Sequence, residues 1–311
     1  MKTHNRTPLL FLPLFYIIFT LSQAFAFIPL EPNRFLYFEN QSYQIKEGDT
    51  LVELAVKFHI GYTHLVLANP EVDPWIPPPG KEIILPYQIL IPEEFLLKEK
   101  EYILINLPEM RLYYFRNHSF RVYPIGIGDE NKLPPLGKFY IERKQKKPFW
   151  YPPPSIRAED PTLPKVVPPG PDNPMGDYAL YLDRGLYAIH GTNKPESIGR
   201  RTTHGCFRLY PEDIKKLWEI APLNLPVYIL YEPFKIAIME DKIYLQAFPD
   251  VENSIKNPFL HILSKLDKLS ASKGATYQIN LLLLEKILEK PDGLVHEIGK
   301  LKNLSPLFSN P

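Results

Sequence analysis

Residues 41–88 carry the hydrophobic pattern of a small mixed module. Polar and apolar positions first alternate, as in a strand, and after a turn that ends at Thr50 the apolar positions recur at helical spacing. Pro70 stops a second short helix, because proline disfavours helical backbone at the residue before it. The predicted elements are a strand, two helices and a strand, at residues 42–45, 51–58, 62–68 and 82–85.

Residues 99–232 contain short runs of aromatic and β-branched residues separated by Gly, Pro and Asn turns. This pattern is typical of a β-rich domain, and we expect a β-sandwich-like fold. One clear helix is predicted over residues 211–220, because Pro211 can open a helix and Glu212 and Asp213 suit its first turn. The predicted strands are residues 102–107, 111–115, 120–126, 137–143, 180–182, 187–190 and 227–230.

Residues 233–311 have the weakest pattern. Residues 236–248 fit a hairpin, and apolar residues recur at helical spacing over residues 259–266 and 281–288. The tail beyond Asn303 is expected to be loose. We therefore expect a multidomain chain whose partly helical C-terminal extension packs on the core.

Residues 1–26 have the layout of a secretory signal peptide. Lys2 and Arg6 are followed by an apolar run over residues 8–21, and small residues then occupy both cleavage positions of Ala24–Ala26. A membrane anchor is the alternative, but the run is shorter than the about 20 residues that span a bilayer. We expect cleavage, no stable membrane anchor afterwards and a periplasmic location. No cysteine lies near the cleavage site, which argues against a lipid anchor.

Composition narrows the function classes. The 35 prolines among 311 residues favour rigid loops and strand edges over a helical bundle. The net charge of +1 comes without a basic stripe, so nucleic acid is not an expected partner. The sequence has no glycine-rich phosphate loop, no zinc spacing of Cys and His and no EF-hand loop, so no metal or cofactor is expected.

The candidate chemistry centres on Cys206, the only cysteine of the chain. His204 and Gly205 precede it, His190 lies upstream and Arg208 follows. A nearby imidazole can take the proton of a thiol, glycine permits a sharp turn that aims N–H groups at a carbonyl, and a guanidinium suits a carboxylate. From the chemistry alone, an inert core cysteine and histidines that bind a metal remain alternatives.

Two family resemblances go further. Residues 41–88 resemble a LysM domain, the small glycan-binding module, through Tyr43–Leu51, Leu54–Ala55, Phe58, Ala68–Pro70 and Gly80. Residues 99–232 resemble the YkuD-type L,D-transpeptidase catalytic domain through Pro135–Ile141, Pro168–Gly176, His190–Thr192, Ser197–Gly199, Thr203–Leu209 and Asp213.

The second resemblance implies roles for individual residues. Cys206 would be the nucleophile and His190 its general base, with Gly191 as part of the same motif. His204 would lie beside the thiol and, with Gly205 and Cys206, contribute backbone to an oxyanion hole.

The resemblance defines the expected substrate-binding residues less sharply: Arg208, Gly191, Thr203, Trp150 and Tyr151. Arg208 would hold a substrate carboxylate, with a structural salt bridge to Asp213 as the alternative. Trp150 and Tyr151 would line the cleft, or else belong to an aromatic core.

The sequence departs from the family pattern near the nucleophile. Thr203 stands where serine is usual and keeps the hydroxyl, so its hydrogen bond is expected to survive. Phe207 replaces a small aliphatic residue, and Leu209 stands where methionine is common. Phe207 is expected to reshape the packing behind the nucleophile.

The resemblances imply a peptidoglycan L,D-transpeptidase. A tetrapeptide stem would acylate Cys206, and an amine of another stem or of an outer-membrane lipoprotein would accept the acyl group. The expected partners are therefore stem peptides and glycan strands. Hydrolysis by the same cysteine, as an L,D-carboxypeptidase, and a non-catalytic peptidoglycan-binding wall protein are the alternatives.

Overall fold

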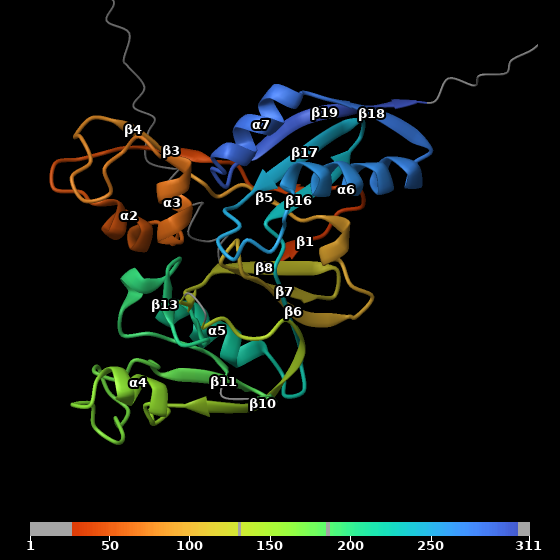
Figure 1. Ribbon diagram of the computed structural model, residues 1–311. Helices are drawn as coiled ribbons and strands as arrows, with labels where there is room; N and C mark the ends of the chain where they lie inside the picture. Colours follow the sequence, from red (N-terminus) through yellow and green to blue (C-terminus); the bar gives the residue numbers. More distant parts are fainter. Residues whose placement is uncertain (1–26, 130–131, 185–186, 304–311) are drawn as a thin grey trace, which may run out of the picture.

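The computed structural model describes residues 27–129, 132–184 and 187–303. The predicted signal peptide and the tail after Asn303 lie outside the described residues. Figure 1 shows a small module beside a central β-rich domain, with a C-terminal unit packed against both. Within the described ranges no single helix is long and apolar enough to cross a membrane, although helices α2 and α3 pass this test as a pair bent by 119°.

The module has the predicted order of strand, helix, helix and strand. Thr50 caps the first helix, since its side chain accepts a hydrogen bond from the N–H of Glu53. The Asn69 amide, at the end of the second helix, bonds both backbone groups of Ile84 and ties helix to strand. The elements are β3 (Gln41–Gln44), α2 (Leu51–Lys57), α3 (Tyr62–Ala68) and β4 (Glu82–Leu85), with β3 antiparallel to β4.

The central domain is a nine-stranded sheet in the order β1-β8-β7-β6-β15-β10-β11-β12-β14. Strand β10 pairs with β15 through its first residues and with β11 through its last, and a bulge at Ile141–Arg143 lies between the two pairings. The sheet therefore bends along β10. The strands are β1 (Ile28–Pro29), β6 (Glu101–Asn106), β7 (Arg111–Arg116), β8 (Ser119–Pro124), β10 (Gly137–Lys146), β11 (Tyr178–Leu182), β12 (Ala188–His190), β14 (Phe207–Arg208) and β15 (Pro226–Leu230).

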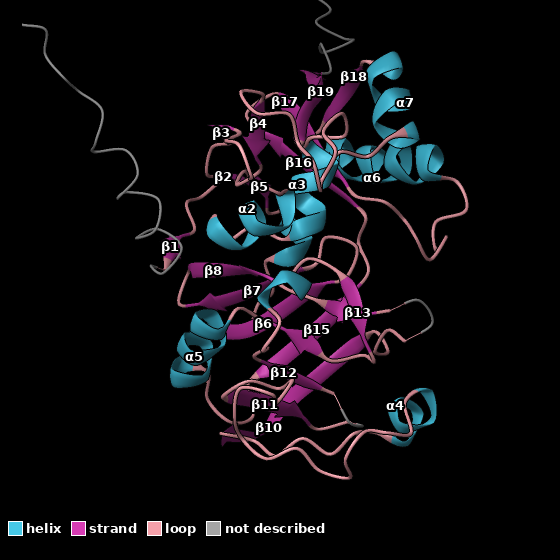
Figure 2. Ribbon diagram, turned by 90° about the vertical axis from the view of Figure 1, so that its left-hand side faces the viewer, coloured by secondary structure: helices cyan, strands magenta, loops and turns pink. Residues whose placement is uncertain are grey.

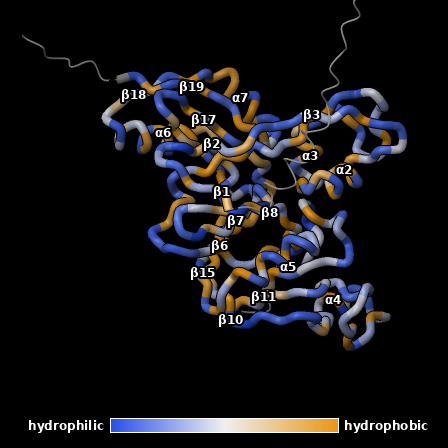
Figure 3. Tube along the Cα trace, turned by 180° about the vertical axis from the view of Figure 1, so that it is seen from behind, coloured by the Kyte–Doolittle hydropathy of each residue, from blue (hydrophilic) through white to orange (hydrophobic). Residues whose placement is uncertain are grey.

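Bending gives the sheet a core between its two halves. Ile103 and Ile105 of β6 meet Leu180 of β11 there, and helix α5 (Pro211–Ile220) closes the core through residues such as Ile214. Tyr102 and Leu104 point to the other face, where residues 89–97 cover them. Figure 3 shows apolar residues concentrated along these central strands. The expected β-rich domain is therefore present, and its sandwich-like core is formed by one curled sheet.

The C-terminal unit is an α+β layer. Helices α6 and α7 cover one face of a four-stranded sheet, and β2 (Leu36–Tyr37) and β5 (Ile89–Leu90) pack on the other. The sequence indicates the first hairpin and both helices but not β18 and β19. Gly299 is one reason why β19 is not predicted from the sequence, because a glycine weakens the pattern of a strand. The fold needs glycine here, since a Cβ would lie 2.2 Å from the Gln278 carbonyl oxygen. The elements are β16 (Phe234–Met239), β17 (Lys242–Ala247), α6 (Pro258–Ser272), β18 (Ala275–Ile279), α7 (Leu281–Glu289) and β19 (Val295–Asn303).

Candidate active site

The site is built on the parallel pair β12 and β14. In this register Ile189 pairs with Phe207, and His190 pairs with Arg208. Ile189 and Phe207 are fully buried in the central core. Because side chains alternate along strands, His190, Cys206 and Arg208 share the opposite face. The bulk of Phe207 therefore fills the core beneath the site rather than the site itself.

A tight turn precedes the thiol. The Thr203 hydroxyl donates to the Cys206 carbonyl at 2.7 Å and accepts from the Gly205 N–H at 3.2 Å. The hydrogen bond expected of the Thr203 hydroxyl is thus present. Gly205 has a φ of +105°, and a Cβ here would lie 2.8 Å from the Tyr187 ring. Its N–H, expected in an oxyanion hole, is directed at Thr203 instead.

Cys206 lies at the edge of a small apolar cluster. Its side chain packs against the buried cluster of Met175, Ala179 and Ala188, as do Trp150 and Tyr181. Burial raises the pKa of the Cys206 thiol, and a backbone hydrogen bond from Ala188 and the nearby Arg208 charge offset this only in part. The resting thiol is therefore neutral at physiological pH, so attack on a carbonyl requires a neighbouring base.

His190 is suited to be that base. Its side chain is 5% exposed, and Nδ1 lies 2.6 Å from the Gly191 carbonyl oxygen. Because a carbonyl only accepts, this contact assigns the ring proton to Nδ1 and leaves Nε2 as the acceptor. Burial and the Arg208 charge lower the pKa of His190 to about 4, so the ring is neutral at pH 7 and its Nε2 is free of a proton.

His204 makes its contacts away from the strand pair. Its Nε2 lies 3.1 Å from Glu159 Oε1, at the end of the short helix α4 (Pro154–Glu159). Lys132 Nζ lies 2.8 Å from the same oxygen. Glu159 was not found from the sequence, since it belongs to no motif and lies far from Cys206 along the chain. The structure thus adds a carboxylate and an ammonium group around His204.

Arg208 is half-buried between the thiol and Glu196. Both groups raise its pKa, but burial outweighs them and lowers it. Its alternative partner, Asp213, pairs instead with His59 of the module, where Nε2 and Oδ2 lie 3.3 Å apart. The structure therefore does not support an Arg208–Asp213 salt bridge.

Comparisons with known proteins identify both domains. Residues 100–229 match the L,D-transpeptidase catalytic domain, and residues 43–86 match the LysM domain. The probable L,D-transpeptidase YbiS of Escherichia coli is 42% identical over 223 residues, which cover 69% of this chain and 71% of that protein. The chain belongs to the L,D-transpeptidase family. Its two matched domains point to peptidoglycan as the partner.

Further relatives extend the range of similarity. The probable L,D-transpeptidase ErfK/SrfK of Salmonella typhimurium is 40% identical over 61% of this chain and 62% of its own length. The putative L,D-transpeptidase YkuD of Bacillus subtilis is 30% identical over 60% of this chain and 98% of its own length.

The described residues hold no cluster of His, Cys, Asp or Glu suited to a metal.

The two aromatic residues expected in the L,D-transpeptidase cleft differ in position. Trp150 packs in the Cys206 cluster and is fixed by a pair of backbone hydrogen bonds with Val167, at 2.8 and 2.9 Å. Tyr151 is 69% exposed. The structure therefore places Trp150 and Cys206 against the same apolar cluster and leaves Tyr151 at the surface.

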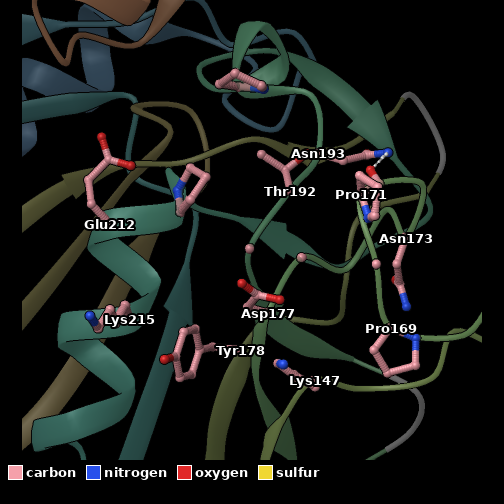
Figure 4. A pocket seen from close by; sticks show the side chains of 15 residues that line it. Lys147, Pro169, Pro171, Asn173, Asp177, Tyr178, Thr192, Asn193, Glu212 and Lys215 are labelled. Atoms are coloured by element: carbon pink, nitrogen blue, oxygen red, sulfur yellow. Dashed lines mark hydrogen bonds between the residues drawn. The ribbon is translucent and has the colours of Figure 1, made fainter.

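A cleft of about 920 Å³ adjoins the His190 end of β12 (Figure 4). Gly191 and Thr192 line it, whereas Cys206 is not among its lining residues. Its walls carry charges of both signs: Asp177, Glu212, Lys147 and Lys215.

Proposed function

We propose that Cys206 is the nucleophile of this L,D-transpeptidase and that His190 takes its proton. The observation that carries the proposal is the strand pair that places His190 and Cys206 on one face, with the imidazole held neutral. His190 Nε2 removes the thiol proton as Sγ attacks the acyl carbon of a stem peptide. The C–N bond breaks, the imidazolium returns the proton to the leaving amine, and a thioester remains.

The second half-reaction regenerates the enzyme. An acceptor amine attacks the thioester, the new amide forms, and Cys206 leaves as thiolate and recovers the proton through His190. We propose a tetrapeptide stem, cut after its third residue, as donor, and a second stem or an outer-membrane lipoprotein as acceptor. Water in place of the amine gives a carboxypeptidase with the same residues.

Further residues of the site would bind the substrate. The positive charge of Arg208 acts on both His190 and Cys206. A guanidinium so near the thiol could bind a carboxylate of the stem peptide. Trp150 packs against the same apolar cluster as Cys206 and would add an apolar surface for the stem. We place the mature protein in the periplasm, after cleavage of residues 1–26, where its substrate lies.

Mass spectrometry of purified tetrapeptide stems incubated with the full mature chain tests the proposal. We expect loss of the terminal residue, a transient acyl adduct on the protein, and a cross-linked product when an acceptor amine is present. A Cys206→Ala variant should give none of these. Turnover by that variant, or no reaction of the wild type with any acceptor, would refute the assignment.

A further inference from the structure

Helix α3 of the LysM module begins on the backbone of the catalytic domain. The first N–H groups of a helix have no partner within it and need acceptors elsewhere. Here the N–H of Tyr62 donates to the Ile198 carbonyl at 3.0 Å, and the N–H of Thr63 to the Gly199 carbonyl at 3.1 Å. The cap residue, Gly61, has no side chain to serve instead. The catalytic domain therefore completes this helix.

Gly199 allows that approach. Its φ is +77°, and a Cβ here would lie 2.3 Å from the Tyr62 nitrogen and 2.4 Å from the Gly61 Cα. Both contacts are with backbone, which cannot move aside as a flexible side chain can. A larger residue at position 199 must therefore separate α3 from the catalytic domain.

The same part of the module also contacts the chain just after the nucleophile. The buried Tyr210 hydroxyl donates to the Ile60 carbonyl at 3.1 Å, and its ring lies 4.4 Å from that of His59. His59 in turn reaches Asp213 at the start of α5. Figures 1 and 2 show α2 and α3 lying next to the central sheet.

These contacts fall on both sides of Cys206 in the sequence. Ile198–Gly199 precede it and Tyr210 follows it, so residues 59–63 of the module hold both ends of the segment that carries the thiol. Between these ends the segment contains β13 (Arg201–Thr203), the Gly205 turn and β14. The module therefore contributes, beside the pairing of β14 with β12, to holding the segment that carries Sγ.

We propose that residues 59–63 of the LysM module are a positioning element for the Cys206 loop, in addition to any role of the module in binding glycan. The inference rests on the proposed role of Cys206. It predicts that the module affects the reaction of a substrate that carries no sugar. A module that served only as a tether would have no such effect.

The test compares full-length variants on a soluble, sugar-free tetrapeptide stem. We expect Gly199→Ala to slow acylation of Cys206 by about tenfold or more, since small displacements of reacting groups cost large factors in rate. Gly274→Ala is the matched control, because Gly274 also has a positive φ, of +62°, but a Cβ would meet nothing within 4 Å. This control should react like the wild type.

Alkylation by iodoacetamide supplies a second readout, because the chain has one cysteine and mass spectrometry reports it directly. A loosened loop exposes the half-buried sulfur, so alkylation of Gly199→Ala should become faster while acylation becomes slower. General loss of stability, measured well below the unfolding temperature, would not produce this opposite pair of changes.

Tyr210→Phe keeps the ring against His59 and removes only the hydroxyl contact with the module. Tyr210→Phe should also be acylated more slowly and alkylated faster than the wild type, but to a smaller degree than Gly199→Ala. If Gly199→Ala does not fold, Tyr210→Phe alone tests the positioning role. Wild-type rates of both reactions in the folded variants would overturn the inference. A wild type that the stem never acylates would refute the proposed function, while the alkylation ratio would still decide the positioning role.

Discussion

The ammonium group of Lys235 lies 2.6 Å from Oε1 of Glu109, and both side chains are fully buried. Lys235 belongs to the C-terminal unit and Glu109 to the catalytic domain. Arg111 also reaches Glu109, at 3.0 Å, and donates to the Pro86 carbonyl at the end of the module. The His64 ring of the module contacts the Glu109 carbonyl. Glu109 thus joins all three parts of the chain: its carboxylate binds Lys235 and Arg111, Arg111 reaches the module, and its backbone carbonyl contacts His64.

Replacing Lys235 with Met should be strongly destabilising. Although burial opposes both charges, the two cations hold the pKa of Glu109 at about 2, and the pKa of Lys235 falls only to about 8. Both groups are therefore charged at pH 7, and removing Lys235 leaves the buried Glu109 with only the part of its counter-charge that Arg111 supplies. We expect a loss of about 3–5 kcal/mol in the free energy of unfolding, measured with urea.

The matched control is Lys242→Met, which removes an exposed ion pair with Glu297. The N–O distance of this pair, 2.8 Å, is close to the 2.6 Å of the buried pair. Exposed pairs are screened by water and contribute little to stability, so this variant should lose much less than Lys235→Met. Equal losses for the two variants would show that the Glu109 network does not hold the three parts together.

Buried neutral histidines should make the protein acid-sensitive. Burial lowers the pKa of His64 to about 3 and that of His190 to about 4. The unfolded chain takes up these protons near pH 6.5 and the folded chain does not, so stability is complete above pH 6.5 and falls as the pH drops toward 4. The His190 shift alone corresponds to roughly 3 kcal/mol.

Urea unfolding at pH 7, 6 and 5 measures this dependence. His64→Gln should flatten it, whereas the exposed His118→Asn should leave it unchanged. An equally steep loss in both variants would mean that other groups cause the acid sensitivity.

The sequence predicts what is local in this protein. Strand and helix periods, the Thr50 cap and the motif from Thr203 to Arg208 depend on residues close together in the chain. The Glu159–His204 and His59–Asp213 contacts join residues 45 and more positions apart, and neither side of these pairs has a periodic signal. Such contacts exist only once the curled sheet and the docked module bring distant loops together.

Glycan binding by the module can be tested without removing it. Deletion of residues 41–88 would also strip Tyr210 and Asp213 of their partners, so a single exposed residue is the better target. Trp75 is 60% exposed on the loop between α3 and β4. Trp75→Ala should weaken binding to intact sacculi about threefold to tenfold, since an aromatic contact contributes about 1 kcal/mol.

Sedimentation of the protein with purified sacculi gives the bound fraction. Turnover of a soluble stem should not change in this variant. Leu282→Ala, at an exposed residue of α7, is the control and should bind sacculi like the wild type. Unchanged binding of Trp75→Ala would place the glycan-binding surface elsewhere.

A carbapenem should form a covalent adduct at Cys206, by resemblance to the family, and His190 should control its rate. The buried thiol is neutral, so ring opening by Sγ requires His190 Nε2 to take its proton. His190→Ala should therefore slow adduct formation about a hundredfold, the usual contribution of a general base, without changing the final mass. Intact-mass analysis over time measures this. Phe207 should not hinder the reaction, because its ring lies in the core on the other face of β14. An adduct in Cys206→Ala, or equal rates in the wild type and His190→Ala, would contradict the mechanism.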